Sequence, residues 1–239
     1  MPDTPPNGDV PAEFVSFKHP LPHLAEAFKG KGPVRIVAIG SSSTAGRGDV
    51  VPYPHRLEMY LRVRYGERFP NLRIDVINRG KGGEEAIEEL PRFDTDIFAE
   101  HPSLVIWQVG TNAVFRKQEK KYDLDKVAAA IATGLERLRG QPMDVVLIDP
   151  QYVTAMLLDD RVQDSERMVS LISAAAEKAE VSVFRRWELM RHWHLHNNIS
   201  FERMLDPTDH DNLHQSDWST LRVSQALCDA IANALPAAM

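Results

Sequence analysis

The sequence predicts an α/β fold in which helices cover both faces of a five-stranded parallel sheet. Short apolar runs rich in β-branched residues alternate five times with segments of helical periodicity. Strands separated by such segments pair in parallel through right-handed crossovers. The chain of 239 residues, 43% of them hydrophobic, suits one large buried core, and it contains neither an internal repeat nor a linker.

Residues 1–32 are predicted to form an N-terminal arm ahead of a single domain at 33–239. Six prolines fall within this arm. Because proline fixes φ and lacks an N–H group, we expect no regular structure there except a short helix around Leu24–Phe28. The arm is expected to pack on the edge of the sheet or on a neighbouring subunit. In the second case the protein would be a homo-oligomer.

The first predicted strand is Val34–Ile39, whose residues are mostly apolar and β-branched, and Gly40 ends it. A helix is predicted at 53–66 because apolar residues recur there at helical spacing and Gly66 suits a helix end. The apolar run at 72–78 predicts the second strand.

The rest of the chain repeats this alternation. Glu84 and Glu85 are predicted to begin a helix, whose positive end favours acidic residues. A strand at Leu104–Val109 follows the breaker His101-Pro102. The remaining predicted elements are strands at 145–148 and 181–184 and helices at 123–139, 161–180, around 187–193, and 218–234.

The bulk composition excludes several classes of function. Net charge is −6, from 28 basic and 34 acidic residues without a long basic face, so we expect no nucleic-acid partner. No apolar run reaches the length of a membrane span. The N-terminus shows no signal peptide, so we expect a cytoplasmic protein, with an exported and trimmed protein as the alternative. A single cysteine, Cys228, excludes an intramolecular disulfide and a cysteine-based zinc cluster.

Three closely spaced histidines, His192, His194 and His196, raise the question of a metal site. On a helix only His192 and His196 share a face. The segment also lacks a carboxylate motif such as HExxH. We therefore expect no metal there.

Small polar residues follow three of the predicted strands. They are Ser41–Ser43, Gly80–Gly83 and Gly110–Asn112. The carboxyl ends of parallel strands meet at one edge of a sheet, where α/β proteins place their chemistry. The sequence therefore predicts a functional site at this edge.

The residues near this edge suit acyl transfer, which needs a hydroxyl nucleophile, an imidazole base, a carboxylate that orients the base, and donors for the oxyanion. The serines at 41–43 supply the hydroxyl. His214 supplies the imidazole, and Asp211 or Asp209 supplies the carboxylate, of which the spacing favours Asp211.

Four blocks of the sequence together resemble the SGNH (GDSL-type) hydrolases, a family of serine esterases and lipases. Gly40-Ser41-Ser42 matches the first block and Asn78–Gly83 the second. Gly110-Thr111-Asn112 matches the third block, and Asp211–His214 matches the last. The blocks occur in the family's order.

The resemblance implies a three-layer α/β/α, flavodoxin-like fold and a triad of Ser42, His214 and Asp211. It also implies an oxyanion hole made by the N–H groups of Ser42 and Gly83 and the side chain of Asn112. No cofactor is implied. The expected activity is hydrolysis of a small-molecule or acylated-carbohydrate ester, or a thioester, through an acyl-enzyme.

Three positions depart from the family pattern. Ser41 stands where the family usually has Asp, Ala113 where the third block usually ends in Asp, and Gln215 where Pro often follows the histidine. We expect Ala113 to cost a hydrogen bond that supports the site. Two alternatives stay open: a carbohydrate O-acetyl esterase on the same scaffold, and a catalytically inactive binding protein.

Overall fold

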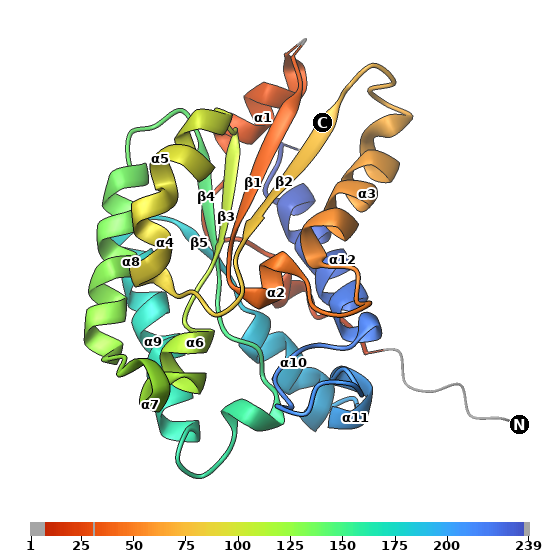
Figure 1. Ribbon diagram of the computed structural model, residues 1–239. Coiled ribbons are helices and arrows are strands. Elements are labelled where there is room, and N and C mark those ends of the chain that lie inside the picture. Colours follow the sequence, from red (N-terminus) through yellow and green to blue (C-terminus); the bar gives the residue numbers. More distant parts are fainter. Residues whose placement is uncertain (1–7, 31, 237–239) are drawn as a thin grey trace, which may run out of the picture.

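The computed structural model describes residues 8–30 and 32–236, and its centre is one parallel sheet (Figure 1). The five strands lie in the order β2-β1-β3-β4-β5. This is the flavodoxin-like order, so the predicted fold class is confirmed. The strands are β1 (Val34–Gly40), β2 (Ile74–Gly80), β3 (Leu104–Gln108), β4 (Asp144–Ile148) and β5 (Ser182–Phe184).

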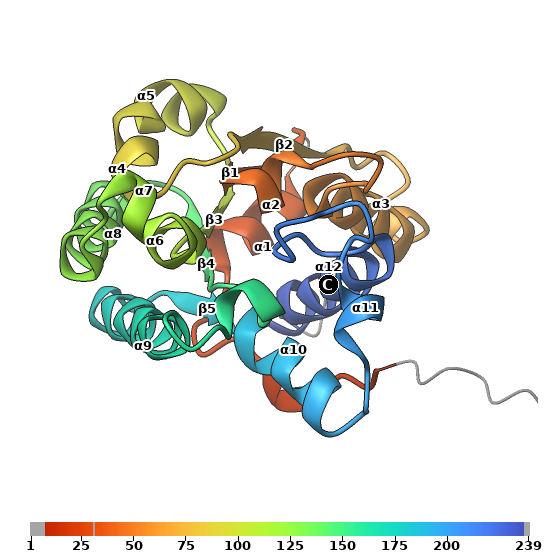
Figure 2. The same cartoon turned by 60° about the horizontal axis from the view of Figure 1, so that its bottom comes forward.

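Long helices cover both faces of the sheet and make three layers (Figures 1 and 2). α3 (Tyr53–Gly66) and α12 (Asp217–Asn233) pack together on one face. α8 (Leu124–Leu138) and α9 (Val162–Ala179) pack together on the other. Because both faces are covered, every residue of β3 is buried, as are all but one of β1.

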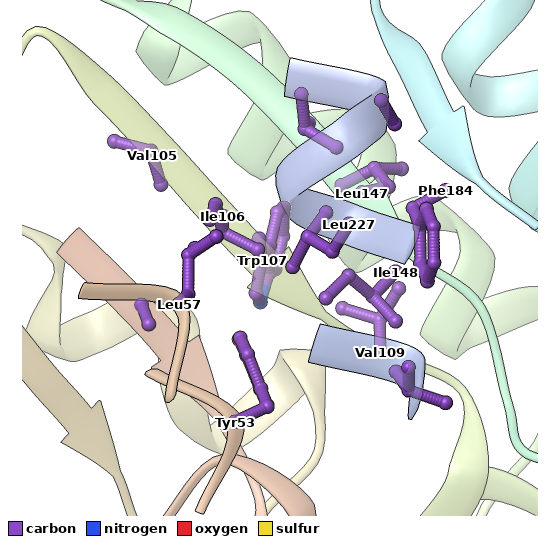
Figure 3. Close-up of a cluster of buried hydrophobic side chains, with 14 of the residues drawn as sticks. Tyr53, Leu57, Val105, Ile106, Trp107, Val109, Leu147, Ile148, Phe184 and Leu227 are labelled. Carbon is purple, nitrogen blue, oxygen red and sulfur yellow. The ribbon is translucent and has the colours of Figure 1, made fainter. Parts of the chain in front are cut away.

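The core contains the central strands and the helix residues that face them, and Figure 3 shows part of it. Trp107 of β3 is fully buried and packs edge-to-face against Phe93, with 5.0 Å between the ring centroids. Its indole N–H donates to the buried carboxylate of Glu89 at 2.6 Å. The core therefore includes a carboxylate as well as apolar side chains.

β2 begins and ends two residues later than predicted. Leu72 belongs to a turn in which its N–H donates to the carbonyl of Phe69 at 2.9 Å. Pairing with β1 continues from Val34 opposite Ile74 to Gly40 opposite Gly80. Gly80 therefore ends the strand, and Gly82 and Gly83 follow it.

Several short helices were not predicted, because three to five residues are too few to show a helical repeat. Among the described residues they are α2 (Ser42–Ala45), α5 (Phe93–Asp96), α6 (Thr111–Phe115), α7 (Lys117–Lys120), α11 (Phe201–Met204) and four 3₁₀ turns. The helix predicted to begin at Glu84 and Glu85 is present as α4 (Ala86–Glu89), with Glu85 as its N-cap. α10 (Arg186–Leu195) corresponds to the helix predicted around 187–193. Within the described ranges, no helix is long and apolar enough to cross a membrane.

The described part of the N-terminal arm lies against the domain. The carbonyl of Gly8 accepts from Arg222 of α12 at 2.6 Å, and the N–H of His19 donates to Ser182 of the edge strand β5 at 3.0 Å. The predicted short helix is present as α1 (Pro22–Lys29). Prolines 2, 5 and 6, on which the arm prediction partly depends, lie outside the described residues.

Candidate active site

The three polar strand ends lie at one edge of the sheet, as predicted. Gly40 and Gly80 end neighbouring parallel strands at the same level, and Figure 2 turns this end of the molecule towards the viewer, with α2 and α6 upon it. Only glycine fits at position 80, because a Cβ there would lie 2.2 Å from the backbone nitrogen of Ala45. This close approach lets α2 pack directly on β2.

Ser42 is the serine that meets the histidine. It is the first residue of α2, and its Oγ lies 2.9 Å from Nε2 of His214. Ser41 is buried instead, and both its hydroxyl and its N–H donate to Oε1 of Gln108, at 3.0 and 3.1 Å. Ser41, one of the three positions that depart from the family pattern, thus anchors the serine loop to β3.

The carboxylate beside His214 belongs to Asp209, which corrects the assignment of Asp211. Oδ2 of Asp209 lies 2.9 Å from Nδ1 of His214. It also accepts the N–H groups of Leu213 and His214, at 2.9 and 2.7 Å. The side chain of Asp211 is 53% exposed, and its carboxylate lies 3.7 Å from Arg47.

A tight turn explains this exchange. The N–H of Asn212 donates to the carbonyl of Asp209 at 3.2 Å, and Asn212 itself is left-handed, with φ 52°. The chain therefore folds back on itself. The carboxylate of Asp209 accepts the N–H groups of Leu213 and His214, while Asp211 faces outwards. Burial pushes the pKa of Asp209 up, but the N–H groups of His214 and Leu213 and the imidazole outweigh it and hold that pKa below its ordinary value.

Arg47 is a neighbour that the sequence did not predict. Its Nη1 lies 3.2 Å from Oδ1 of Asp209 and 2.9 Å from Nδ1 of His214. A guanidinium can only donate. In the tautomer that lets Nε2 accept the Ser42 proton, Nδ1 donates to Asp209, and Arg47 is left to donate to Oδ1.

The two other residues of the predicted oxyanion hole, Gly83 and Asn112, lie after two different strands, β2 and β3. Gly83, left-handed at φ 79°, belongs to the loop after β2. In the same loop, a Cβ on Gly82 would lie 3.9 Å from that of Ser42. Asn112 is buried on α6, and its Nδ2 donates to the carbonyl of Glu84 at 2.8 Å. An amide nitrogen carries two hydrogens, so Asn112 keeps a second N–H.

Buried polar side chains that the sequence analysis missed join these parts. Gln151 accepts from Thr111 of the third block at 3.0 Å and donates to the carbonyl of Leu213, beside His214, at 3.2 Å. Glu85 accepts the backbone N–H of Ala113 at 2.9 Å. The expected cost of Ala113 in place of Asp stays a prediction. Sequence alone gave no signal, since burial of a lone Gln or Glu is invisible in a periodic pattern.

The three spaced histidines do not come together around a common centre. Nε2 of His192 lies 3.1 Å from Asp9, and Nδ1 of His194 lies 2.9 Å from the carbonyl of Ile199. In the described part of the chain, no group of three or more His, Cys, Asp or Glu side chains could hold a metal ion. Burial raises the pKa of the Cys228 thiol to about 11, which leaves it a poor nucleophile.

A small cavity adjoins the serine and the histidine. Its volume is about 30 Å³, and its walls include Gly46, Val50 and Pro52 as well as Ser42 and His214. A cavity of this size holds one water molecule or a group the size of a methyl. Any larger substrate group has to lie outside it.

Solved structures with the same fold are esterases and hydrolases. Axe2, an acetylxylan esterase from Geobacillus stearothermophilus, aligns with a TM-score of 0.68 and 18% identity over 85% of this chain and 97% of its own. A catalytic mutant of the same enzyme gives 0.71 and 17% over 87% and 100%. LAE5, an alpha/beta hydrolase from the metagenome of Lake Arreo, Spain, gives 0.69 and 18% over 86% and 99%.

No curated protein sequence matches the chain. The pattern of the non-GDSL lipase-like family, however, matches residues 7–236. This match covers the described arm and the domain together, and it agrees with the SGNH-like hydrolase fold of the structural neighbours. The chain therefore belongs to the non-GDSL lipase-like family of esterase-type hydrolases.

Proposed function

We propose that the protein hydrolyses carboxylic esters through Ser42, His214 and Asp209. The observation that carries this proposal is the contact of 2.9 Å between Oγ of Ser42 and Nε2 of His214, with Asp209 at 2.9 Å on the other ring nitrogen. This arrangement supplies a nucleophile, a general base and a carboxylate that holds the ring.

The first half of the reaction forms an acyl-enzyme. Neutral His214 accepts the proton of Ser42 as Oγ attacks the ester carbonyl, and the resulting imidazolium is stabilised by Asp209. The N–H groups of Ser42 and Gly83 and the free N–H of Asn112 stabilise the oxyanion. His214 then gives its proton to the leaving alcohol as the ester bond breaks.

The second half releases the acid. His214 takes a proton from water, whose oxygen attacks the acyl carbonyl, and it returns that proton to Oγ of Ser42 as the acyl bond breaks. A thioester would follow the same course with a thiol as leaving group. Arg47 donates to Oδ1 of Asp209 at 3.2 Å throughout, which supports the carboxylate in its ionised form.

A fluorophosphonate probe tests this proposal, because it labels only an activated serine. We expect the wild type to be labelled and to hydrolyse p-nitrophenyl acetate. Ser42→Ala should abolish labelling and lower kcat by roughly 10⁴-fold or more. The matched control is Ser170→Ala, which removes an exposed hydroxyl on α9 and should leave both readouts unchanged. A folded wild type without labelling or hydrolysis would instead favour the inactive binding protein.

The small cavity favours a second, narrower candidate, a carbohydrate O-acetyl esterase. A cavity of about 30 Å³ beside Ser42 has room for an acetyl methyl, and a longer acyl chain would have to extend beyond it. Axe2, which shares the fold, is an acetylxylan esterase. Acetyl, butyryl and octanoyl p-nitrophenyl esters, acetyl-CoA and acetylated xylose separate the candidates. Turnover of acetyl esters and acetylated xylose alone supports the narrower one, and faster turnover of octanoyl esters rejects it.

A further inference from the structure

Glu85 is a buried carboxylate to which the proposed reaction gives no role. It lies two residues after Gly83, and only 2% of it is exposed. Arg92, which is close in sequence, pairs with Glu84 and Asp96 instead. A carboxylate is rarely buried without a partner that offsets the lost hydration. The groups that do contact Glu85 therefore indicate its role.

Those groups are backbone N–H groups, two at the start of α6 and one at the start of α4. Oε1 of Glu85 accepts the N–H of Gly110 at 2.8 Å, and Oε2 accepts that of Ala113 at 2.9 Å. The N–H of Ala86 also donates to Oε1, at 3.0 Å. The first N–H groups of a helix have no partner within it. One carboxylate from another loop thus fixes both ends of the segment that contains Asn112.

The preceding residue fixes Asn112 itself. The carbonyl of Glu84 accepts one N–H of the Asn112 side chain at 2.8 Å. Glu84 therefore holds the amide of Asn112, and Glu85 holds the backbone on either side of it. Through these contacts the loop after β2, with Gly83, and the loop after β3, with Asn112, form one unit.

We propose that Glu85 is a positioning residue of the oxyanion hole, which aims the free N–H of Asn112 at the carbonyl oxygen of an ester on Ser42. The inference rests on the proposed function. Glu85 also accepts the backbone N–H of Ala113, the residue where the family usually has Asp. Glutamine cannot replace Glu85 fully, because three N–H groups donate to the two carboxylate oxygens and an amide has only one acceptor oxygen.

A double-mutant cycle on p-nitrophenyl acetate hydrolysis tests the proposal. Asn112→Ala should lower kcat by about 10²–10³-fold, the usual effect of losing one oxyanion donor. Glu85→Gln should lower kcat by about 10-fold or more, with KM changed by less than about 3-fold. Combining the two should cost little beyond Asn112→Ala alone, because Glu85 acts through Asn112.

A purely structural role predicts a different cycle. It would lower kcat by the same factor with and without Asn112, and that result overturns the proposal, as does wild-type kcat in Glu85→Gln. Rates are divided by the end point of fluorophosphonate labelling, so that only folded sites are counted. Glu136→Gln, an exposed change on α8, is the control and should keep wild-type kcat.

A second variant guards against misfolding. Glu85→Asp keeps the charge and both oxygens but is one methylene shorter, so its kcat should lie between those of the wild type and Glu85→Gln. If neither variant folds, Glu85 serves stability alone and the proposal falls. Failure of the proposed function has another signature, which is full activity in Ser42→Ala whatever the cycle shows.

Discussion

The side chain of Asp209 performs two tasks with one oxygen. Oδ2 accepts the backbone N–H groups of Leu213 and His214, which shapes the turn, and it also contacts Nδ1 of His214. Backbone N–H groups are fixed donors, so they hold the carboxylate in place before the imidazole becomes charged. The turn that binds the carboxylate thus also holds it against Nδ1 of His214.

Replacing each aspartate in turn separates the two candidates. Asp209→Asn should lower kcat by about 10⁴-fold with little change in KM, because an amide favours the wrong tautomer of the histidine. Asp211→Asn removes a carboxylate that is half exposed, and kcat should change by less than about 3-fold. Initial-rate kinetics on p-nitrophenyl acetate measure both. Equal losses in the two variants would contradict the assignment of Asp209.

The positions of the candidate residues were predictable where the chain is regular and not where it turns. Ser42 lies two residues after the end of β1 at Gly40, so its position at the sheet edge could be inferred from the run Val34–Ile39. Spacing alone favoured Asp211, since a D-x-x-H pattern says nothing of how a loop folds. The left-handed residue Asn212 reverses the chain and moves Asp209 inwards instead.

At the scale of elements, the short helix α4 concentrates buried charge. Glu85 precedes it and Glu89 ends it, one helical turn apart, and both are buried. Burial first, and then the charge of Glu85, raises the pKa of Glu89 well above its ordinary value. The hydrogen bond from Trp107 offsets this only in part. The ionised form of Glu89 is therefore unfavourable in the folded protein.

The raised pKa of Glu89 predicts that the stability of the protein depends on pH. A carboxyl whose pKa is raised on folding contributes most below its unfolded pKa of about 4.3, and that contribution is lost as pH rises through the folded value. Glu89→Gln cannot ionise, yet its carbonyl can still accept from Trp107. The free energy of unfolding of the variant minus that of the wild type should therefore increase by about 1–3 kcal/mol between pH 5 and pH 9.

Urea unfolding at several pH values measures this gain. Other groups that titrate in this range are shared by both proteins and cancel in the difference, except Glu85, whose charge interacts with Glu89. Glu67→Gln, at an exposed glutamate after α3, should show no such trend. A difference between Glu89→Gln and the wild type that stays constant from pH 5 to pH 9 would show that folding does not raise the pKa of Glu89.

Strands and long helices were predictable, and most of the short helices were not. Strands β1 and β3 are buried on both faces and read as continuous apolar runs, so their positions followed from the sequence. α2 and α6, which carry Ser42 and Asn112, are too short to show periodicity. Contacts with neighbouring strands, such as Ser41 with Gln108, help to hold α2 in place, and no local pattern reveals those contacts.

At the scale of the whole molecule, the topology followed from the alternation of strands and helices, but the extent of the arm's contacts did not. The carbonyl of Asp9 accepts from the indole of Trp193 on α10 at 2.8 Å, and that of Val15 accepts from Asn233 on α12 at 2.9 Å. Prolines indicate where regular structure is absent, not what the segment packs against. The division into an arm at 1–32 and a domain at 33–239 stays a prediction.

Phe14 provides the test of that division. Its side chain is only 8% exposed and packs against His192 of α10, with 5.7 Å between the ring centroids, and under the guanidinium of Arg185. If the arm folds together with the domain, Phe14→Ala should lower the free energy of unfolding by about 2–4 kcal/mol in one cooperative transition. Tryptophan fluorescence, which includes the arm contact of Trp193, should coincide with far-UV circular dichroism. Val63→Ala, at a side chain that is 79% exposed, is the control and should cost under about 0.5 kcal/mol. A separate early fluorescence change in Phe14→Ala, with the main transition unmoved, would instead make the arm an independent appendage.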